Sequence, residues 1–267
     1  MRPGERDETP YIRYAERTGR SIEIHDDVVV KTAPLDSIRR EALKTELAYE
    51  LGQASGLFRA PRVVRLEEHE GRLILERIEG VDGIGPIEAR LARCADLPER
   101  LGAALAAIHH GLSLPAEHQA PVPPGYLWAS MENVAIHGDF NGTNVMVRTS
   151  SKELVIVDWS TSARLGPSAT MAPGWLDLVW FIRAQYHRLG FGGIPAGVAP
   201  ACSRLVRAYL SADGKGSVGE FGRYLTQVIA EDRKRRNVCF TLRRRVAAFR
   251  GDAALAQYAR RLAKEKE

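Results

Sequence analysis

The sequence is poor in cysteine and contains no long hydrophobic run. Its three cysteines, Cys94, Cys202 and Cys239, are odd in number and widely spaced, a pattern that fits neither a disulfide framework nor a zinc site. The best apolar stretch, "GWLDLVWFI", carries Asp177 and is too short to cross a bilayer as a helix. The opening "MRPGERDETP" is charged and lacks the apolar segment of a signal peptide. We therefore expect a cytoplasmic protein with free thiols in its core.

Charge is unevenly distributed along a chain of otherwise ordinary globular composition, with 45% hydrophobic and 27% charged residues. Residues 201–267 hold 16 Lys and Arg against 7 Asp and Glu, whereas the whole chain carries a net charge of +5. Solvated helix faces account for such a region, and a surface that attracts anionic ligands or weakly associates with membranes is the alternative. The region lacks the interleaved aromatic residues of single-strand binders and any named DNA-binding motif, so no specific nucleic acid is expected.

The hydrophobic pattern divides the chain near residue 80. Before that point the runs "YIRYAE", "SIEIH", "DVVVKT", "RVVRLEE" and "RLILERI" predict short strands. Apolar residues at helical spacing follow Asp36, a candidate N-cap, and predict one helix that stops at Gly52 or Gly56. We therefore predict an α+β fold of two lobes. Residues 1–80 form a small antiparallel sheet with one helix, and residues 81–267 form a larger, mainly helical lobe.

The larger lobe is expected to contain short strands around residue 140 and helices on both sides of them. One basic run near the C-terminus, "RKRRNVCFTLRRRVAAF", also has helical periodicity. Its apolar residues fall near one stripe that is expected to pack on the lobe: Val238, Cys239, Leu242, Val246 and Phe249.

A polar stretch framed by strand-like runs, "IHGDFNGTNVMV", has the spacing His137-x-Asp139-x-x-x-x-Asn144. This spacing matches the catalytic loop of kinases, in which the Asp faces the substrate hydroxyl and the Asn holds Mg²⁺. Asp158 ends the next apolar strand, "LVIVDW". If the two strands form one hairpin, Asn144 and Asp158 reach the same edge. Mg²⁺ binds through one or two such protein groups together with substrate phosphates.

These motifs and their order resemble the aminoglycoside phosphotransferase and choline kinase group, which are small-molecule kinases with a protein-kinase-like fold. "DVVVK" is similar to the strand that carries the nucleotide lysine, and "LILERIEG" to the strand before the interlobe hinge. "LGAALAAIHH" resembles the helix before the catalytic loop, and "WLDLVW" the Asp-bearing helix after it. The resemblance covers most of the chain, but no family motif is identified beyond about residue 200.

The resemblance implies an enzyme that uses ATP or GTP together with Mg²⁺. Asp139 would orient the acceptor hydroxyl and take its proton, which leaves late in a loose transition state. Asn144 and Asp158 would hold Mg²⁺ against the phosphates. Lys31 would contact the α- and β-phosphates.

Two further contacts to the nucleotide follow from the same resemblance. A glutamate of the first helix would keep the lysine in place, and of Glu41, Glu46 and Glu50 we choose Glu46 because it borders the apolar face. The hinge backbone around Glu76 to Ile78 would form hydrogen bonds with adenine.

Three polar residues near these motifs are expected to have structural roles. His137 is predicted to form hydrogen bonds within the loop and not to act as a general base. Asp177, near the start of an apolar helix, is predicted to accept backbone amides of the catalytic loop. His109, at a helix end, is predicted to be a packing residue.

One segment departs from the kinase pattern. Kinases cover the phosphates with a glycine-rich hairpin turn, whereas this position reads "ERTGRS" with Gly19 alone. Either the short turn at Arg17–Arg20 covers the phosphates with fewer amides, helped by Arg17 or Arg20, or the nucleotide binds weakly. Because the catalytic and metal residues are retained, we favour an active enzyme.

A small-molecule acceptor fits the sequence better than a protein acceptor. Gly138 replaces the Arg that reads an activation-loop phosphate in protein kinases, and the segment between Asp158 and Asp177 is short. The basic C-terminal region favours a sugar, a sugar phosphate or a similar metabolite over a polycationic aminoglycoside. The alternative class is a catalytically weak, nucleotide-binding pseudokinase or a regulatory binding protein.

Overall fold

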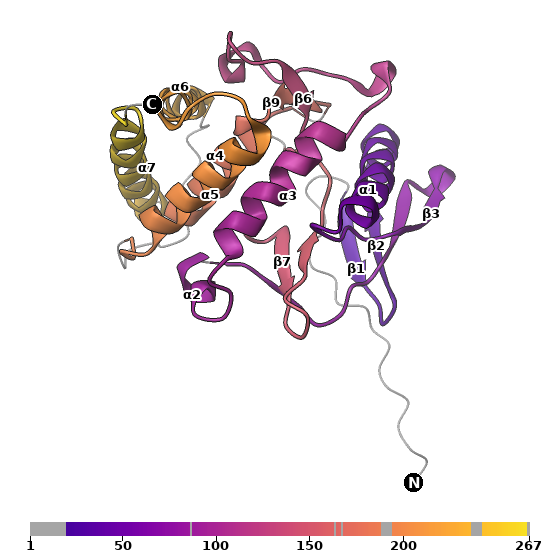
Figure 1. Cartoon of the computed structure of the whole chain (residues 1–267). Coiled ribbons are helices and arrows are strands. Elements are labelled where there is room, and N and C mark those ends of the chain that lie inside the picture. Colours follow the sequence, from indigo (N-terminus) through magenta and orange to yellow (C-terminus); the bar gives the residue numbers. More distant parts are fainter. Residues whose placement is uncertain are drawn as a thin grey trace.

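The computed structural model describes residues 20–265 except 86, 163, 167, 188–193 and 236–241. Its N-terminal part holds one sheet and one long helix (Figure 1). These elements are β1 (Ser21–Ile24), β2 (Val28–Thr32), α1 (Leu35–Ser55), β3 (Val63–Glu67) and β4 (Arg72–Glu76). The expected strand at residues 11–16 and most of the turn at Arg17–Arg20 lie outside the described residues.

The sheet is antiparallel throughout, with the strand order β1-β2-β4-β3. Helix α1 covers it, with Ile38 and Ala42 packed against Leu73 and Leu75 in a small buried cluster. The helix starts at Leu35, so Asp36 lies in its first turn and the N-cap prediction was wrong. Its C-terminal end is confirmed, because Gly56 adopts φ +67° there, a left-handed conformation that favours glycine.

The rest of the chain is mainly helical, with two small sheets that flank the loop containing Asp139 and Asn144. The strands are β5 (Val81–Gly83), β6 (Asn133–Ala135), β7 (Val145–Arg148), β8 (Leu154–Ile156) and β9 (Met171–Pro173). The helices are α2 (Ile87–Leu91), α3 (Leu97–Gly111), α4 (Trp175–His187), α5 (Val198–Asp213), α6 (Val218–Arg235) and α7 (Leu242–Leu262). Short 3₁₀ turns lie between β3 and β4, at Glu68–Glu70, and between α3 and β6, at Ala116–His118 and Pro124–Tyr126. None of the described helices is long and apolar enough to cross a membrane.

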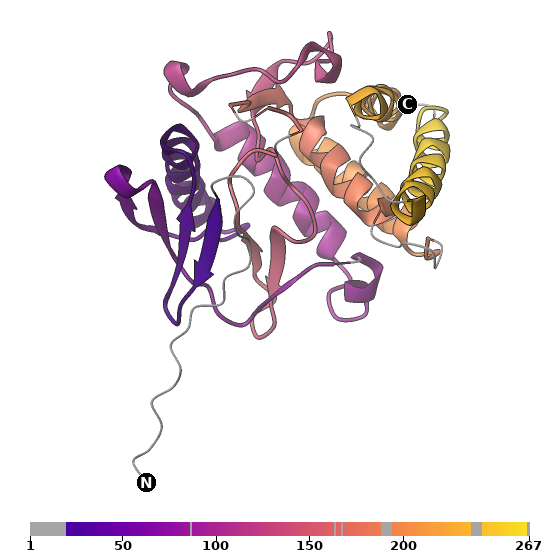
Figure 2. The same cartoon turned by 180° about the vertical axis from the view of Figure 1, so that it is seen from behind.

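The predicted two-lobed α+β fold is confirmed (Figure 2). We keep the boundary near residue 80 as a proposal, because β4 ends at Glu76 and β5 then pairs with β7 in a different sheet. The hydrophobic core continues across this point, since Ala48, Phe58 and Ala60 belong to the same buried cluster as α3 and α4. The two parts are therefore packed together and not merely linked.

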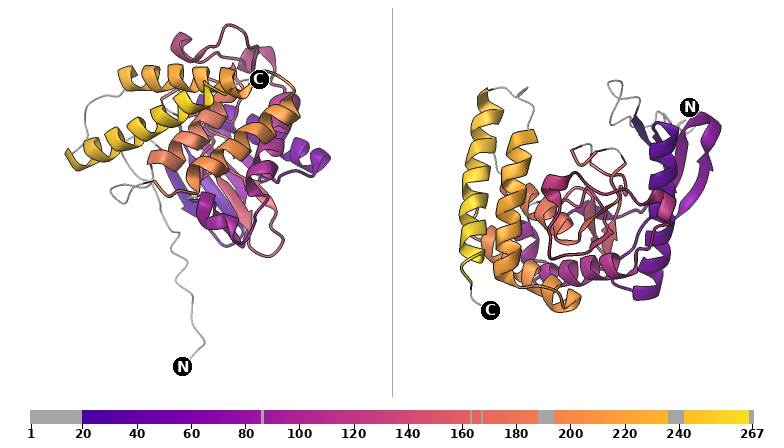
Figure 3. Two further views of the ribbon diagram at one scale, coloured as in Figure 1. Left: turned by 60° about the vertical axis from the view of Figure 1, so that its left-hand side comes forward. Right: turned by 90° about the horizontal axis from the view of Figure 1, so that it is seen from above.

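Helices α6 and α7 lie side by side at the edge remote from α1 (Figure 3). Within α7, Leu255, Tyr258 and Leu262 face inward and are buried. Phe249 is 74% exposed, which contradicts its predicted packing. It lies about two and a half helical turns from Tyr258 and so points to the opposite side. Val238 and Cys239 lie outside the described residues.

Helices α3 and α5 approach each other closely at Gly102. A Cβ atom placed there would lie 2.6 Å from the backbone nitrogen of Tyr209 and 2.9 Å from the carbonyl oxygen of Leu205. The absence of a side chain on α3 thus sets the position of Tyr209 on α5. Neither backbone atom can move aside without shifting the helix.

We predict that Gly102→Ala lowers the free energy of unfolding by about 1–3 kcal/mol, because the added methyl overpacks the contact. This sign is opposite to the usual gain from replacing a helical glycine. The control Ala107→Gly, on the half-buried side of the same helix, is expected to cost about 0.5–1 kcal/mol. Urea denaturation measures both, and a Gly102→Ala protein that is more stable than wild type would show that the helices can move apart freely.

Candidate active site

The predicted metal residues lie at the same end of one hairpin, which β7 and β8 form. Val145 pairs with Ile156, and the amide of Val157 donates to the carbonyl of Asn144 at 2.9 Å. This confirms the hairpin on which the sequence argument depended. Asp158 follows with φ +60°, a left-handed conformation that is uncommon outside glycine and is often found at functional sites.

Asp139 and Asn144 are in direct contact within the loop between β6 and β7. The Nδ2 atom of Asn144 donates to the backbone oxygen of Asp139 at 3.0 Å and to its Oδ2 at 3.2 Å. Burial and the negative charge of Asp158 raise the pKa of Asp139 to about 6, although hydrogen bonds from Asn141 and Asn144 oppose the shift. Asp139 is therefore an ionised carboxylate at neutral pH with more basicity than an exposed Asp.

Lys31 connects the two parts of the molecule at this site. Its ammonium donates to Oδ1 of Asp158 at 2.6 Å and forms a second ion pair with Glu41. Burial alone would lower the pKa of Lys31, but the charges of Asp158 and Glu41 outweigh it and hold the pKa above its ordinary value. For Asp158, burial alone would raise the pKa, but Lys31 and Ser160 outweigh it and lower the pKa to about 2. Both groups are charged.

The glutamate that holds Lys31 is Glu41, and the choice of Glu46 was wrong. Glu41 is buried on α1, whereas Glu46 is exposed. The two residues are five positions apart, which turns their side chains by about 140° around the helix. The side of α1 that carries Glu41 is buried, so Glu46 points away from Lys31.

Asp177 holds the catalytic loop, as the sequence predicted. Its carboxylate is fully buried and accepts the amides of His137 at 2.7 Å and Gly138 at 2.9 Å. Burial raises its pKa, but the hydrogen bond and charge of His109 dominate and lower it. His109 is thus more than a packing residue, since its Nε2 lies 3.1 Å from Asp177 and its Nδ1 lies 2.8 Å from the hydroxyl of Tyr209.

His137 has the structural role that was expected. It is buried, its Nε2 lies 3.1 Å from the carbonyl of Val157, and its Nδ1 accepts the amide of Asp139 at 3.2 Å. Burial lowers the pKa of His137 to about 4. The ring is therefore neutral at physiological pH, and its two nitrogens fix the loop.

The sequence analysis did not identify Lys44, a lysine on α1 that is buried like Lys31 on β2. Its side chain is 1% exposed, and its ammonium donates to the carbonyl of His137 at 2.8 Å. Burial lowers the pKa of Lys44 to about 8, with Asp177 and Glu41 opposing that shift. The signal was present in the sequence, because Glu41, Lys44 and Ala48 are spaced i, i+3, i+7 and so share one helix face.

At the end of β4, where the sequence predicts that the nucleotide base binds, two of three backbone amides are already hydrogen-bonded. The amide of Glu76 donates to the carbonyl of Arg62 at 2.9 Å, and the carboxylate of Glu76 pairs with Arg59. The amide of Arg77 donates to Asp27 at 2.9 Å. The amide of Ile78 forms no hydrogen bond with another described residue, so of these three amides it is the one free to donate to a ligand.

The donor set of the site suits a hard cation with few protein ligands. Across the described part of the chain, no three His, Cys, Asp or Glu side chains cluster as a metal site. Asn144 and Asp158 instead offer two oxygen donors beside Asp139, and the negative charge of Asp158 contributes to the raised pKa of Asp139. Such a set of oxygen donors fits Mg²⁺, which keeps waters and binds substrate phosphates.

We predict that Asp177→Asn lowers the free energy of unfolding by about 3 kcal/mol or more, since the amide nitrogen of Asn faces buried donors that it cannot satisfy. The exposed control Asp26→Asn is expected to change it by about 0.5 kcal/mol or less. Guanidinium denaturation of the purified variants gives both values. Equal stabilities of Asp177→Asn and wild type would contradict the role of this carboxylate as the anchor of the loop.

Comparison with known proteins identifies the fold but not a close relative. Neither a protein-family model nor a curated protein matches the sequence. The structure is similar to a choline/ethanolamine kinase family protein from Mesorhizobium loti, with 16% identity, a TM-score of 0.55, and coverage of 97% of this chain and 90% of the other. A macrolide 2′-phosphotransferase from Brachybacterium faecium gives 14% identity and a TM-score of 0.52, with 97% and 93% covered.

A third solved structure carries a bound nucleotide. It is the GDP complex of aminoglycoside 2′-phosphotransferase-IIIa, with 14% identity, a TM-score of 0.51, and 93% and 91% of the two chains covered. At these identities the likeness concerns the fold. The chain therefore has the two-lobed, protein-kinase-like fold of choline kinases and antibiotic phosphotransferases.

Proposed function

We propose that this protein is a small-molecule kinase that transfers the γ-phosphate of ATP or GTP to a hydroxyl group. The observation that carries the proposal is the joint placement of Asp139, Asn144, Asp158 and Lys31 by elements from both parts of the molecule. Each of the four has the residue type and contact that phosphoryl transfer requires. The fold shared with choline kinases and phosphotransferases supports the same reaction class.

Asp139 would act on the acceptor. Its carboxylate accepts a hydrogen bond from the acceptor hydroxyl and aligns that oxygen with the γ-phosphorus. As the new P–O bond forms and the bond to the β-phosphate oxygen breaks, the hydroxyl proton passes to Asp139. Because this transfer is late, the main contribution is orientation, and the hydrogen bond from Asn144 keeps the carboxylate in place.

Lys31 would bind the α- and β-phosphates, with Glu41 as its counter-ion. The ion pair fixes the ammonium near Asp158, so the phosphates would enter next to the metal residues. The backbone around Glu76 to Ile78 would bind the base, through the amide of Ile78 and nearby carbonyls. Asn144 and Asp158 would hold Mg²⁺, which when bound neutralises charge on the phosphates.

The two parts of the chain would have different roles in the reaction. Residues 1–80 would form the nucleotide-binding lobe, and residues 81–267 the catalytic and substrate lobe. The acceptor would be a sugar, a sugar phosphate or a similar metabolite, a class favoured by the excess of Lys and Arg beyond residue 200. The widely spaced cysteines, of which Cys94 and Cys202 are buried free thiols, support function in the cytoplasm.

The proposal is tested by phosphate transfer from ATP and GTP to a panel of sugars, sugar phosphates, aminoglycosides and choline. With the best acceptor, Asp139→Asn is expected to reduce kcat by about 10²–10⁴-fold, the usual contribution of a positioned acid–base group, and to leave nucleotide affinity nearly unchanged. A variant that keeps more than about a tenth of wild-type kcat would remove Asp139 from this role. Nucleotide binding without any transfer would favour the pseudokinase alternative.

A matched pair of substitutions on α1 tests the contact to the lysine. Glu41→Gln removes the charge that faces Lys31 and is expected to lower kcat/KM for the nucleotide by about tenfold or more, a barrier change of about 1.4 kcal/mol. Glu46→Gln lies on the exposed side of the same helix and should remain within about twofold of wild type. A larger loss of kcat/KM in Glu46→Gln than in Glu41→Gln would instead identify Glu46 as the partner of Lys31.

A further inference from the structure

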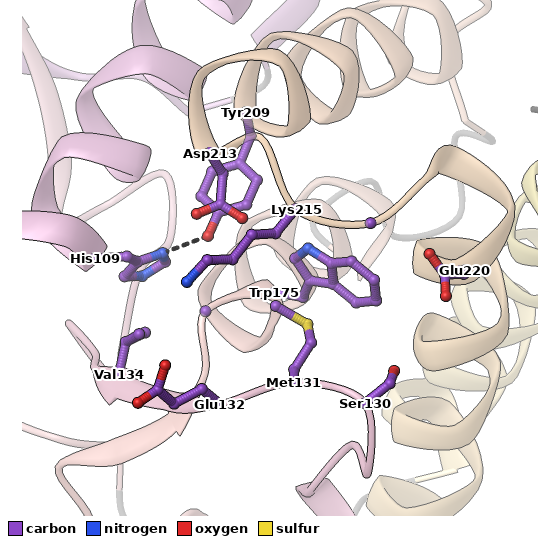
Figure 4. A pocket seen from close by; sticks show the side chains of 12 residues that line it. His109, Ser130, Met131, Glu132, Val134, Trp175, Tyr209, Asp213, Lys215 and Glu220 are labelled. Carbon is purple, nitrogen blue, oxygen red and sulfur yellow. Dashed lines mark hydrogen bonds between the residues drawn. The ribbon is translucent and has the colours of Figure 1, made fainter.

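A cavity of about 350 Å³ lies at the junction of α3, α4, α5 and the start of α6 (Figure 4). This volume is within the range of small-molecule sites. None of the residues assigned to the phosphotransfer site lines it. His109, Tyr209 and Trp175 form part of its wall, and Lys215 and Asp213 come from the end of α5 and the turn that follows. It is therefore separate from the proposed nucleotide and acceptor sites.

One carboxylate on the cavity wall is incompletely paired. The side chain of Asp213 is 5% exposed, and its Oδ1 lies 2.8 Å from Nε2 of His110. Its Oδ2 is buried and has no hydrogen-bond partner among the described residues. A buried carboxylate oxygen without a donor is unfavourable, and in native proteins it commonly indicates a missing ligand, ion or water.

A cationic side chain lines the same cavity together with acidic side chains. Figure 4 shows the side chain of Lys215 lying across it, and within the described part of the chain its ammonium has no ion pair or hydrogen bond. Glu132 lines the cavity and is exposed, whereas Glu220 is occupied by the amide of Ser217 at 3.0 Å. The groups available to a ligand thus comprise the ammonium of Lys215, the carboxylate of Glu132 and the Oδ2 atom of Asp213.

Part of the remaining wall is apolar and adaptable. Met131 and Val134 are half-buried beside the polar groups, and Trp175 is 1% exposed behind them. A thioether side chain fits irregular shapes and makes favourable contacts with aromatic rings. The cavity therefore offers an apolar surface next to a pair of opposite charges.

We propose that this cavity binds a small zwitterion with an apolar side chain, namely a free α-amino acid, and that binding is coupled to the catalytic loop. The ligand ammonium would pair with Asp213 and Glu132, its carboxylate with Lys215, and its side chain with Met131 and Val134. A simple amine would leave Lys215 facing a like charge. A simple anion would face the two carboxylates.

The coupling follows a continuous chain of hydrogen bonds from the cavity wall. The hydroxyl of Tyr209 lies 2.8 Å from Nδ1 of His109, whose Nε2 lies 3.1 Å from Asp177. Asp177 in turn accepts the amides of His137 and Gly138. Tyr209 lines the cavity, so a ligand that displaces its hydroxyl alters the anchor of the loop that carries Asp139, and the regulatory consequence rests on the proposed function. Binding itself does not.

Isothermal titration calorimetry with L-phenylalanine, phenethylamine and hydrocinnamate tests the zwitterion, because the last two compounds each lack one charge of the first. We expect L-phenylalanine to bind at least about tenfold more tightly than either, a difference of about 1.4 kcal/mol. Two cavity variants should each weaken the affinity for L-phenylalanine by a similar factor. They are Lys215→Gln and Asp213→Asn, the second of which keeps an acceptor for His110. The exposed controls Asp36→Asn and Lys264→Gln should bind as wild type does.

Three results would overturn the binding site: no saturable binding of L-phenylalanine or L-leucine, equal affinity for the amine or the anion, or unchanged affinity in both cavity variants. The coupling is tested by the ¹⁵N amide signals of His137 and Gly138. They should shift when L-phenylalanine is added to wild type and stay in place in Tyr209→Phe. Binding without such shifts would overturn the coupling. Neither measurement requires phosphate transfer, so their failure is distinguishable from failure of the proposed kinase activity.

Discussion

The buried carboxylate of Asp177 is the constraint on which the rest of the site depends. A charge that is wholly removed from water is tolerated only with several donors around it, and here the donors are two loop amides and His109. The hydrogen bonds that stabilise Asp177 also fix the groups that donate them. Satisfying Asp177 fixes the backbone of His137 and Gly138, and that backbone determines where the side chain of Asp139 stands.

Helix α1 reaches the same loop from the other part of the molecule. Glu41 pairs with Lys31, and Lys44 donates to the carbonyl of His137, so two charged residues on one helix face contact both β2 and the catalytic loop. A buried ammonium costs free energy, as the lowered pKa of Lys44 indicates. In this arrangement α1 cannot shift without breaking both contacts, which links the position of Lys31 to that of the loop that carries Asp139.

Much of the geometry of the candidate site was predictable because its signals are local. The spacing of Asp139 and Asn144 within one loop, and the place of Asp158 after the next strand, follow from the chain alone, and the hairpin of β7 and β8 brings the last two together. The fold class was predictable for a similar reason, since strand and helix periodicities are read within windows of about ten residues. The role of Asp177 needed only its position at the start of an apolar helix.

The sequence by itself determined which residue types stand at which spacing, and hence the two-lobed α+β fold and the candidate catalytic and metal-binding residues. It did not determine which side of α1 faces the sheet, since Glu41 and Glu46 lie on one helix about 140° apart and both border apolar residues. It also left the contact of Lys44 with His137, the relay from Tyr209 to Asp177 and the cavity beside it undefined. Those features were decided only by tertiary packing, because each joins residues from separate elements whose mutual orientation is set by close contacts such as that at Gly102.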